Sequence, residues 1–524
     1  MDWLIDNIVT LTIFVPTILG LILFLIPEDE VWVIRRAAFV FSLVPLALVL
    51  TMWFIWADSY RIDPTFQFQQ QAEWFTAIGS SYHVGVDGIS LPLMLLTAVL
   101  IPLGILASFG ITERVKTFMT LMLLMETTMF GLFGSLDLMI FFIFWELSLV
   151  PIYFLVRIWG GADRQYASFK FFIYTMAGSL GLLLSIQLIG ISAGTFDIPE
   201  LYNVWVSMDP LEFARSTGLN LSLVKTLAYW AFFIAFAIKV PIWPFHTWLP
   251  DAHTQAPTAG SMMLAGVLLK LGAYGFIRLV IPLFPEMAMQ TAGVLATLGA
   301  ISIVLGGYAA FGQWDFKRLV AYSSINHMGF VVLGIAVMAY SYGKAVLPGA
   351  GGLDPAQTHD AIIATNGAVF QMINHGLSSA GMFFLVGVIY ERAHTRDLKR
   401  FGGIWSLLPL YGGILIFTSM ASLGLPGLNG FVGEFMITRG AWGPFYWQVA
   451  FSMIGLLMTG AYILKGIGEV LHGPTKAEWV GHLEPMTFTE HCVIWPLMAM
   501  MLILGIWPQA ILAIINDTVL HFFS

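Results

Sequence analysis

Cysteine and charged residues are both scarce in this chain of 524 residues. Only 10% of the residues are Asp, Glu, Lys or Arg, and Cys492 is the single cysteine. One cysteine excludes an internal disulfide and cannot supply the ligand set of an iron–sulfur cluster. The motifs G-x-G-x-x-G and G-x-x-x-x-G-K-[ST] are also missing, since Gly343-Lys344 is followed by Ala345. These absences argue against binding of a dinucleotide or a nucleoside triphosphate.

Long apolar runs take the place of these features. The chain is 58% hydrophobic, and runs of about twenty apolar residues recur from end to end, which indicates a polytopic helical membrane protein. No hydrophilic stretch is large enough for a soluble domain, so residues 1–524 are expected to form one transmembrane domain. The N-terminus, MDWLIDN, lacks the basic region of a cleaved signal, so the first helix is expected to be retained. The net charge of -8 is spread over short loops and implies no nucleic-acid partner.

The hydrophobic pattern predicts an all-α fold with fourteen transmembrane spans. They are 3–26, 32–57, 88–110, 117–135, 138–157, 167–191, 225–245, 259–281, 290–311, 319–340, 361–390, 406–437, 446–470 and 492–515. The span 406–437 is too long for one straight helix and contains Gly424-Leu425-Pro426-Gly427, so we expect it to be broken. A small surface helix is expected near Pro210–Arg215 in the long outer segment 192–224.

Basic residues predict the orientation of these spans. With the N-terminus outside, and with residues near the ends of spans counted with the adjoining loop, 14 of the 23 Lys and Arg residues fall in inner loops and 6, among them Arg278, in outer loops. Lys239, Lys270 and Lys465 remain within spans. The positive-inside rule therefore places both termini on the outer face and the 391–405 loop in the cytoplasm.

Charged residues also suggest an internal repeat. Lys239 precedes Lys270 by 31 residues, and Glu434 precedes Lys465 by the same number. The seventh and twelfth spans carry the first member of each pair. They are also the two spans that we expect to be broken, the seventh because of Pro241 and Pro244. Successive spans cross the membrane in opposite directions, so two spans that are five positions apart in the chain are antiparallel. We therefore predict two inverted five-helix repeats, 117–281 and 290–470.

Lys239 and Lys270 are the leading functional candidates. A charged group at mid-membrane costs roughly 2.5–3.5 kcal/mol, so it indicates a functional site. Pro241 and Pro244 deprive two upstream carbonyls of their helical partners, and a lysine beside a broken helix is typical of midplane transport sites. The alternative is that both lysines snorkel to the surface. Lys270 lies about 11 residues inside its span, roughly 16 Å at 1.5 Å per residue, which argues against snorkelling.

Five further ionisable residues lie within the predicted spans: Glu126, Glu146, His327, His375 and Glu434. Burial favours the neutral forms of carboxylates and lysines, and histidine titrates near neutral pH, so the set predicts a proton relay. Other interpretations stay open. Glu146 could be a structural partner of a lysine, the two histidines could be satisfied core residues, and Glu126 could only tune Glu146. Snorkelling is the favoured interpretation of Lys465.

No metal site is expected. His246 and His253 lie seven residues apart around a Pro-rich turn, but no carboxylate or cysteine stands at ligand spacing, which favours a turn-stabilising role.

Several segments together resemble one family. They are FFIFWELSLVPIYFLVRIWGG, KVPIWPFHTWLPDAHTQAPTAG, MLAGVLLKLGAYGFIRL, DFKRLVAYSSINHMGFVVLG and LPGLNGFVGEF. They are similar to the antiporter-like subunits of respiratory complex I, which share ancestry with subunits of multi-subunit sodium/proton antiporters. The resemblance covers nearly the whole chain and implies fourteen transmembrane helices, with inverted repeats in the fourth to eighth and the ninth to thirteenth.

The resemblance also implies roles for individual residues. The family's functional residues fall on an ordered set of positions: Glu146 and Lys239 as a charge pair, Lys270 as the central relay, His327 and His375 along the polar axis, and Glu434 as the distal group. The L-like and N-like subunits of the family are expected to carry lysine at the distal position, so Glu434 distinguishes this chain from them.

The function expected from these observations is proton translocation by a subunit with no redox centre of its own. The resemblance places NADH, FMN, iron–sulfur clusters and quinone in partner subunits of an NADH:quinone oxidoreductase in a bacterial-type inner membrane. The L-like and N-like antiporter subunits are expected among its membrane-arm partners. Two alternatives remain: a subunit of a multi-subunit sodium/proton antiporter, and a structural subunit that conducts nothing. Buried ionisable groups argue against the structural subunit, because a scaffold has no need of their insertion cost.

Overall fold

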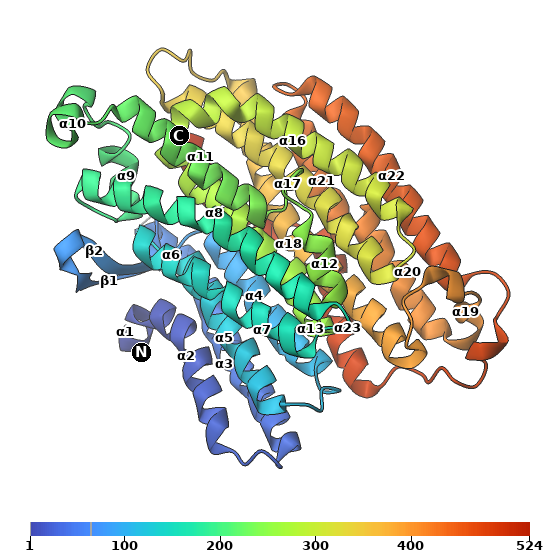
Figure 1. The fold of residues 1–524 in the computed structure, drawn as a ribbon. Helices are drawn as coiled ribbons and strands as arrows, with labels where there is room; N and C mark the ends of the chain where they lie inside the picture. The colour runs from blue at the N-terminus through green and yellow to red at the C-terminus, as the bar shows by residue number, and fades with distance from the viewer. Residues whose placement is uncertain (1, 63–64, 524) are drawn as a thin grey trace.

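Long apolar helices make up most of the computed structural model, which describes residues 2–62 and 65–523 (Figure 1). The helices are α1 (Asp2–Asp6), α2 (Ile8–Ile22), α3 (Val31–Ile62), α4 (Ser90–Ala107), α5 (Val115–Gly134), α6 (Leu138–Leu147), α7 (Leu149–Trp159), α8 (Arg164–Ala193), α9 (Ile198–Val204), α10 (Pro210–Thr217), α11 (Leu221–Lys239), α12 (Trp248–Gln255), α13 (Thr258–Met263), α14 (Leu269–Gly275), α15 (Ile281–Leu283), α16 (Pro285–Gly312), α17 (Phe316–Val346), α18 (Pro355–Ala393), α19 (Ile404–Leu407), α20 (Pro409–Leu423), α21 (Asn429–Ala441), α22 (Tyr446–Leu471), α23 (Phe488–Ile506) and α24 (Gln509–Phe523). Two π-helical turns, Leu264–Leu268 and Phe276–Val280, join α13, α14 and α15 into one long rod.

The predicted helical membrane fold is confirmed. Within the described residues, 13 helical segments are long and apolar enough to cross a membrane. The predicted span 406–437 is divided between α20 and α21, as expected from its Gly-Leu-Pro-Gly sequence, and both Gly424 and Gly427 have positive φ. Positive φ favours glycine because a Cβ would be strained there. Together the 13 segments and this broken helix are consistent with fourteen spans.

The prediction of one helix over 492–515 is wrong. Helix α23 begins at Phe488 and ends at Ile506, and α24 begins after Pro508. Proline disfavours helical backbone in the residue before it, here Trp507, and donates no backbone hydrogen bond, so the chain breaks at this point.

A β-hairpin between α3 and α4 is the one departure from an all-α chain in the described residues. Strands β1 (Gln67–Phe75) and β2 (Ser80–Val86) pair antiparallel, with Gln70 opposite Val84 and Ala72 opposite Tyr82. The surface helix predicted near Pro210–Arg215 is present as α10, and α9 before it was not predicted. In Figure 1 the hairpin, α9, α10 and both termini gather toward the left and upper left of the molecule, and α19 lies at the opposite end.

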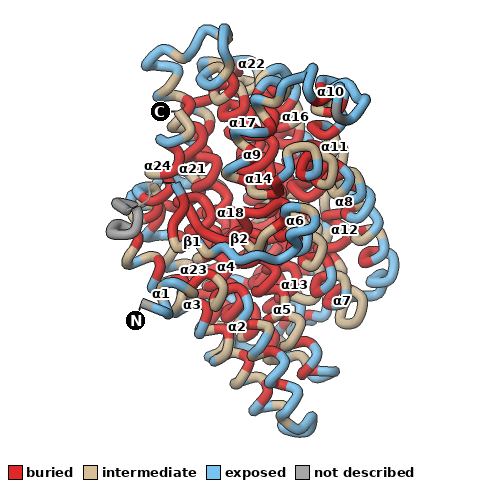
Figure 2. The backbone as a smooth tube through the Cα atoms, turned by 90° about the vertical axis from the view of Figure 1, so that its left-hand side faces the viewer, coloured by how far each residue is buried: buried red, intermediate tan, exposed pale blue. Residues whose placement is uncertain are grey.

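Three central elements form the buried core that holds the candidate site (Figure 2). In the Thr258–Leu283 rod and in α18, every residue of the 18-residue apolar stretch is buried, and in α17 94% of the corresponding stretch is buried. Peripheral helices present their apolar side chains outward. In α23, for example, only 28% of the 18-residue apolar stretch is buried. Ionisable residues on the three central elements are therefore shielded from lipid by other helices of the same chain.

The two predicted five-helix repeats stay a prediction, although each contains a break at the expected place. The first break separates α11 from α12, and the second separates α20 from α21.

Candidate functional site

At the break after α11, the backbone carbonyls find hydrogen-bond partners within the protein. Helix α11 ends at Lys239, before the two prolines. Ala237, whose carbonyl would lose its partner to Pro241, accepts instead from the N–H of Ile242 at 2.9 Å, one residue further along. The Ile238 carbonyl accepts from the indole Nε1 of Trp248 at 2.9 Å. Because these carbonyls find partners within the protein, the broken helix is tolerated at membrane depth.

Lys239 is buried and contacts a hydroxyl group where a carboxylate was predicted. Its Nζ donates to Ser148 Oγ at 3.0 Å and lies 4.3 Å from the centre of the Trp145 ring. Among the described residues no direct ion pair joins Lys239 to Glu146, although the two are near enough to interact electrostatically. Glu146 is half-buried, and its Oε1 atom has no hydrogen-bond partner in the described chain. The predicted charge pair is therefore not closed in this conformation.

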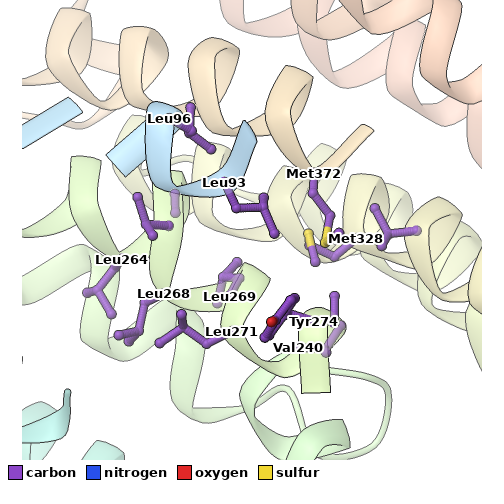
Figure 3. Close-up of a cluster of buried hydrophobic side chains, with 14 of the residues drawn as sticks. Leu93, Leu96, Val240, Leu264, Leu268, Leu269, Leu271, Tyr274, Met328 and Met372 are labelled. Carbon is purple, nitrogen blue, oxygen red and sulfur yellow. The ribbon is translucent and has the colours of Figure 1, made fainter. Parts of the chain in front are cut away.

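Lys270 is fully buried on α14, between the two π-helical turns. Its Nζ donates to the carbonyl of Ala265 and lies 2.8 Å from His375 Nδ1. The neighbouring π-helical turns widen the backbone hydrogen-bonding ladder, a feature that is frequent at functional sites. The buried apolar cluster around Lys270's helix includes Leu269 and Leu271 of the rod, Met328 of α17 and Met372 of α18 (Figure 3). The surface-snorkelling interpretation of Lys270 is wrong.

From Lys270 the polar contacts continue across α18 and α17 to α21. The rings of His375 and His327 lie 5.7 Å apart, and His327 Nδ1 lies 2.8 Å from Glu434 Oε1. Gln371 donates to the same carboxylate oxygen at 3.0 Å, and the hydroxyl of Tyr462 lies 3.2 Å from His327 Nε2. The structure thus places four predicted residues, Lys270, His375, His327 and Glu434, one after another in a buried row of side chains, hereafter the file. Gln371 and Tyr462 were not predicted, because neutral polar residues in apolar spans are common and carry no charge signal.

Glu126 stands apart from this file. It is fully buried on α5, and neither carboxylate oxygen has a hydrogen-bond partner among the described residues. An unpaired buried carboxylate is costly unless it is protonated. The place of Glu126 in the relay stays a prediction, and tuning of Glu146 stays its alternative.

Lys465 has a local structural role. Its Nζ donates to the carbonyl oxygens of Phe311 and Gln313, at 2.6 and 2.8 Å, and lies 3.9 Å from the centre of the Trp314 ring. Helix α16 ends at Gly312, so this ammonium group caps carbonyls that the helix leaves unpaired. Lys465 therefore stabilises the end of α16.

His253 does not stabilise its turn through ring hydrogen bonds. Its ring stacks on Phe383 with centroids 4.5 Å apart, and both ring nitrogens are buried without a hydrogen-bond partner in the described chain. His246 Nδ1 also lacks a partner there. No group of three or more His, Cys, Asp or Glu side chains in the described chain lies close enough together to hold a metal ion.

A second buried charged group was missed by sequence reasoning, which assigned Arg278 to an outer loop. Arg278 lies within the second π-helical turn and forms a fully buried ion pair with Asp87. Its Nε donates to Tyr274 at 3.1 Å, while Asp87 Oδ1 accepts from the N–H groups of Ile89 and Ser90 at the start of α4. The Asp-Gly-Ile-Ser sequence before α4 was the available signal, because Asp is a favoured N-cap residue. This ion pair fixes the rod that carries Lys270 to α4.

Comparisons with known proteins agree with this arrangement. A family profile described as "NADH:quinone oxidoreductase/Mrp antiporter, TM" matches residues 135–348 and 356–459, and one described as "NADH-ubiquinone oxidoreductase chain 4, amino terminus" matches residues 10–131. NADH-quinone oxidoreductase subunit M of Rhodobacter capsulatus is 39% identical over 490 residues, covering 94% of this chain and 90% of the relative. The Pseudomonas aeruginosa subunit M is 38% identical over 489 residues, covering 90% and 88% respectively.

Solved structures give the same result for the fold. A chain of respiratory complex I from Thermus thermophilus with bound NADH aligns with a TM-score of 0.81 and 26% identity, covering 98% of this chain and 100% of that one. A chain of the Mrp complex from a Dietzia species aligns with a TM-score of 0.81 at 18% identity, covering 99% and 98%, and shares the fold. By the family profiles and by its identity to full-length relatives, this chain belongs to the NADH:quinone oxidoreductase/Mrp antiporter family of membrane subunits.

Proposed function

We propose that this chain is a proton-translocating, antiporter-like subunit in the membrane arm of an NADH:quinone oxidoreductase. The file of buried groups from Lys270 through His375 and His327 to Glu434 is the observation that carries the proposal. The relatives named subunit M, which align over nearly their whole length, support the assignment to this complex.

The file is arranged to move positive charge in one direction. Lys270 contacts a carbonyl and an imidazole but no carboxylate among the described residues, so an ammonium group there is uncompensated. Transfer of its proton to His375, and from there to His327, brings the positive charge next to the Glu434 carboxylate. No direct hydrogen bond joins the two histidine rings in the described chain, where His375 Nε2 has no partner, and one water could bridge them.

We assign the switching step to Glu146 and Lys239. Closing a direct contact between them would draw the ammonium group away from Ser148 and change the field acting on Lys270. Moving one charge across about 150 mV costs roughly 3.5 kcal/mol, which is comparable with the energy of making or breaking such a contact. The driving electron transfer from NADH to quinone would occur in partner subunits that hold FMN and the iron–sulfur clusters. L-like and N-like antiporter subunits are the expected neighbours in the membrane.

A sodium/proton antiporter subunit is the weaker alternative. Its support is the shared fold with the Dietzia Mrp chain at 18% identity, against 38–39% identity to the subunit M relatives.

Replacing His375 tests the proposal. His375→Leu removes the imidazole between Lys270 and His327 and is expected to reduce NADH-driven proton translocation by this subunit to background. Quenching of a pH-sensitive dye in sealed vesicles, with subunit content measured in parallel, gives the readout. His359→Leu is the matched control, because His359 lies on the same helix but is exposed. Full translocation by an assembled His375→Leu complex would contradict the proposal.

We further propose a bacterial inner-membrane location with both termini on the outer face. The α18–α19 loop would then face the cytoplasm, and it carries the exposed Lys399. In a Cys492→Ser background, Lys399→Cys should react with an impermeant maleimide in inside-out vesicles and not in intact cells. Labelling in intact cells would reverse the orientation.

A further inference from the structure

A small cavity adjoins the relay at His327. It encloses about 20 Å³ between α17, α18, α20 and α22, enough for one water molecule. Most of its lining is apolar, but four of the lining residues carry hydroxyl groups: Ser323, Ser419, Ser422 and Tyr462. A buried water needs two to four polar partners, and these hydroxyl groups supply them.

Tyr462 connects the cavity to the relay. The side chain is almost fully buried, and its hydroxyl lies 3.2 Å from His327 Nε2 and within hydrogen-bonding reach of Thr459 and Ser323. The other ring nitrogen of His327 faces Glu434 at 2.8 Å. An ionised carboxylate only accepts hydrogen bonds, so Nδ1 carries the proton and Nε2 is left to accept from the phenol. The Tyr462 hydroxyl is thereby oriented toward His327 as a donor.

The residues that line the cavity extend from this contact toward one face of the membrane. Its lining includes Phe316, the first residue of α17, and Gly466 and Ile467, one turn beyond Tyr462 on α22. Phe316 and His327 are eleven residues apart, roughly 16 Å along a helix. The face at that end carries the basic α18–α19 loop, whereas Glu434 lies on the other side of His327 from the Tyr462 hydroxyl.

We propose that Tyr462, together with a water held among Ser323, Ser419 and Ser422, forms a second proton access branch that loads His327 directly from the face carrying the α18–α19 loop. This inference rests on the proposed proton-translocating function. In the transfer, the phenol O–H bond breaks as an N–H bond forms at His327 Nε2, and the Nδ1 proton passes to the Glu434 carboxylate. The cavity water returns a proton to the phenol oxygen and is itself reprotonated from the aqueous face. No oxidant or other reactant is needed.

Tyr462→Phe tests the branch, because it keeps the ring and removes only the hydroxyl. Coupled proton uptake by the whole complex in proteoliposomes is expected to slow by roughly 10²-fold, the lower end of what a positioned proton-transfer group contributes. The solvent deuterium isotope effect on coupled turnover should also rise, since proton transfer becomes limiting. Tyr411→Phe is the matched control: Tyr411 is equally buried, but its hydroxyl donates to the Leu385 carbonyl at 3.1 Å, away from the relay.

Filling the cavity gives an independent test. Ser419→Leu should displace the water and reproduce the slow uptake with its raised isotope effect, whereas Ser419→Ala leaves the space open and should retain most of the activity. Wild-type uptake in Tyr462→Phe, or slow uptake with an unchanged isotope effect, would overturn the inference. If Lys270→Met abolishes translocation while Tyr462→Phe does not slow it, only the branch is wrong. If neither variant changes translocation, the proposed function itself fails.

Discussion

Lys270→Met is expected to abolish proton translocation by this subunit while leaving the complex assembled. Methionine is unbranched, uncharged and one atom shorter than lysine, and it suits the buried cluster of leucines and methionines in this region (Figure 3). The substitution leaves the Ala265 carbonyl and His375 Nδ1 without their partner, at a cost of about 1–3 kcal/mol for each unsatisfied group. Removal of an uncompensated buried ammonium group offsets that cost. Function should therefore be lost without loss of the fold, and Lys270→Ala should act alike with an added cavity.

The measurement is NADH-driven proton translocation in sealed vesicles, normalised to the amount of subunit incorporated. Lys344→Met is the control, because Lys344 lies at the end of α17 and contacts the exposed Gln357 at 3.2 Å. Loss of incorporation in Lys270→Met alone would show that the ammonium group is structural. Translocation at the wild-type rate by a fully incorporated variant would remove Lys270 from the relay.

The membrane helices and the central file could be predicted well from the sequence, because few backbone structures are stable inside a bilayer. Apolar runs of about twenty residues must be helical, and ionisable residues within them are costly enough to mark a site. Lys270, His327, His375 and Glu434 were recognised on that ground, and the structure places them in one file. The break at Gly424–Gly427 was visible because glycine and proline have strong backbone preferences.

What could not be predicted depends on side-chain geometry over a few ångströms. Ser148 rather than Glu146 contacts Lys239, and the two candidates are only two residues apart at the junction of α6 and α7. For Lys465 the sequence favoured snorkelling, and its contacts with the carbonyls at the end of α16 depend on the packing of α22 against α16. The hairpin was hidden because polar strands give a weaker periodic signal than long apolar helices.

The largest effect on coupling is expected from Glu146 and Lys239, whose contact we take to open and close during turnover. In the present conformation Lys239 is held by Ser148 and by the face of Trp145, so the ammonium group has a second partner when Glu146 is away. Truncating one partner of a closed buried ion pair typically costs about 3–5 kcal/mol. Because Ser148 supports the open state, Glu146→Gln should cost less stability than Lys239→Met, which leaves the half-buried carboxylate without its cation.

A double-mutant cycle distinguishes a Glu146–Lys239 pair that only stabilises the structure from one that opens and closes during turnover. Glu146→Gln combined with Lys239→Met should recover incorporation relative to the worse single variant, since no uncompensated charge remains, with a coupling energy within the usual range of about 0.5–3 kcal/mol. Translocation should stay at background in all three variants, because no group is left to move between Ser148 and the carboxylate. Ser148→Ala, which removes only the alternative acceptor, should favour the closed pair and slow turnover without loss of incorporation. A double variant that translocates like the wild type would make the pair a structural clamp, and the switching step would have to lie elsewhere in the complex.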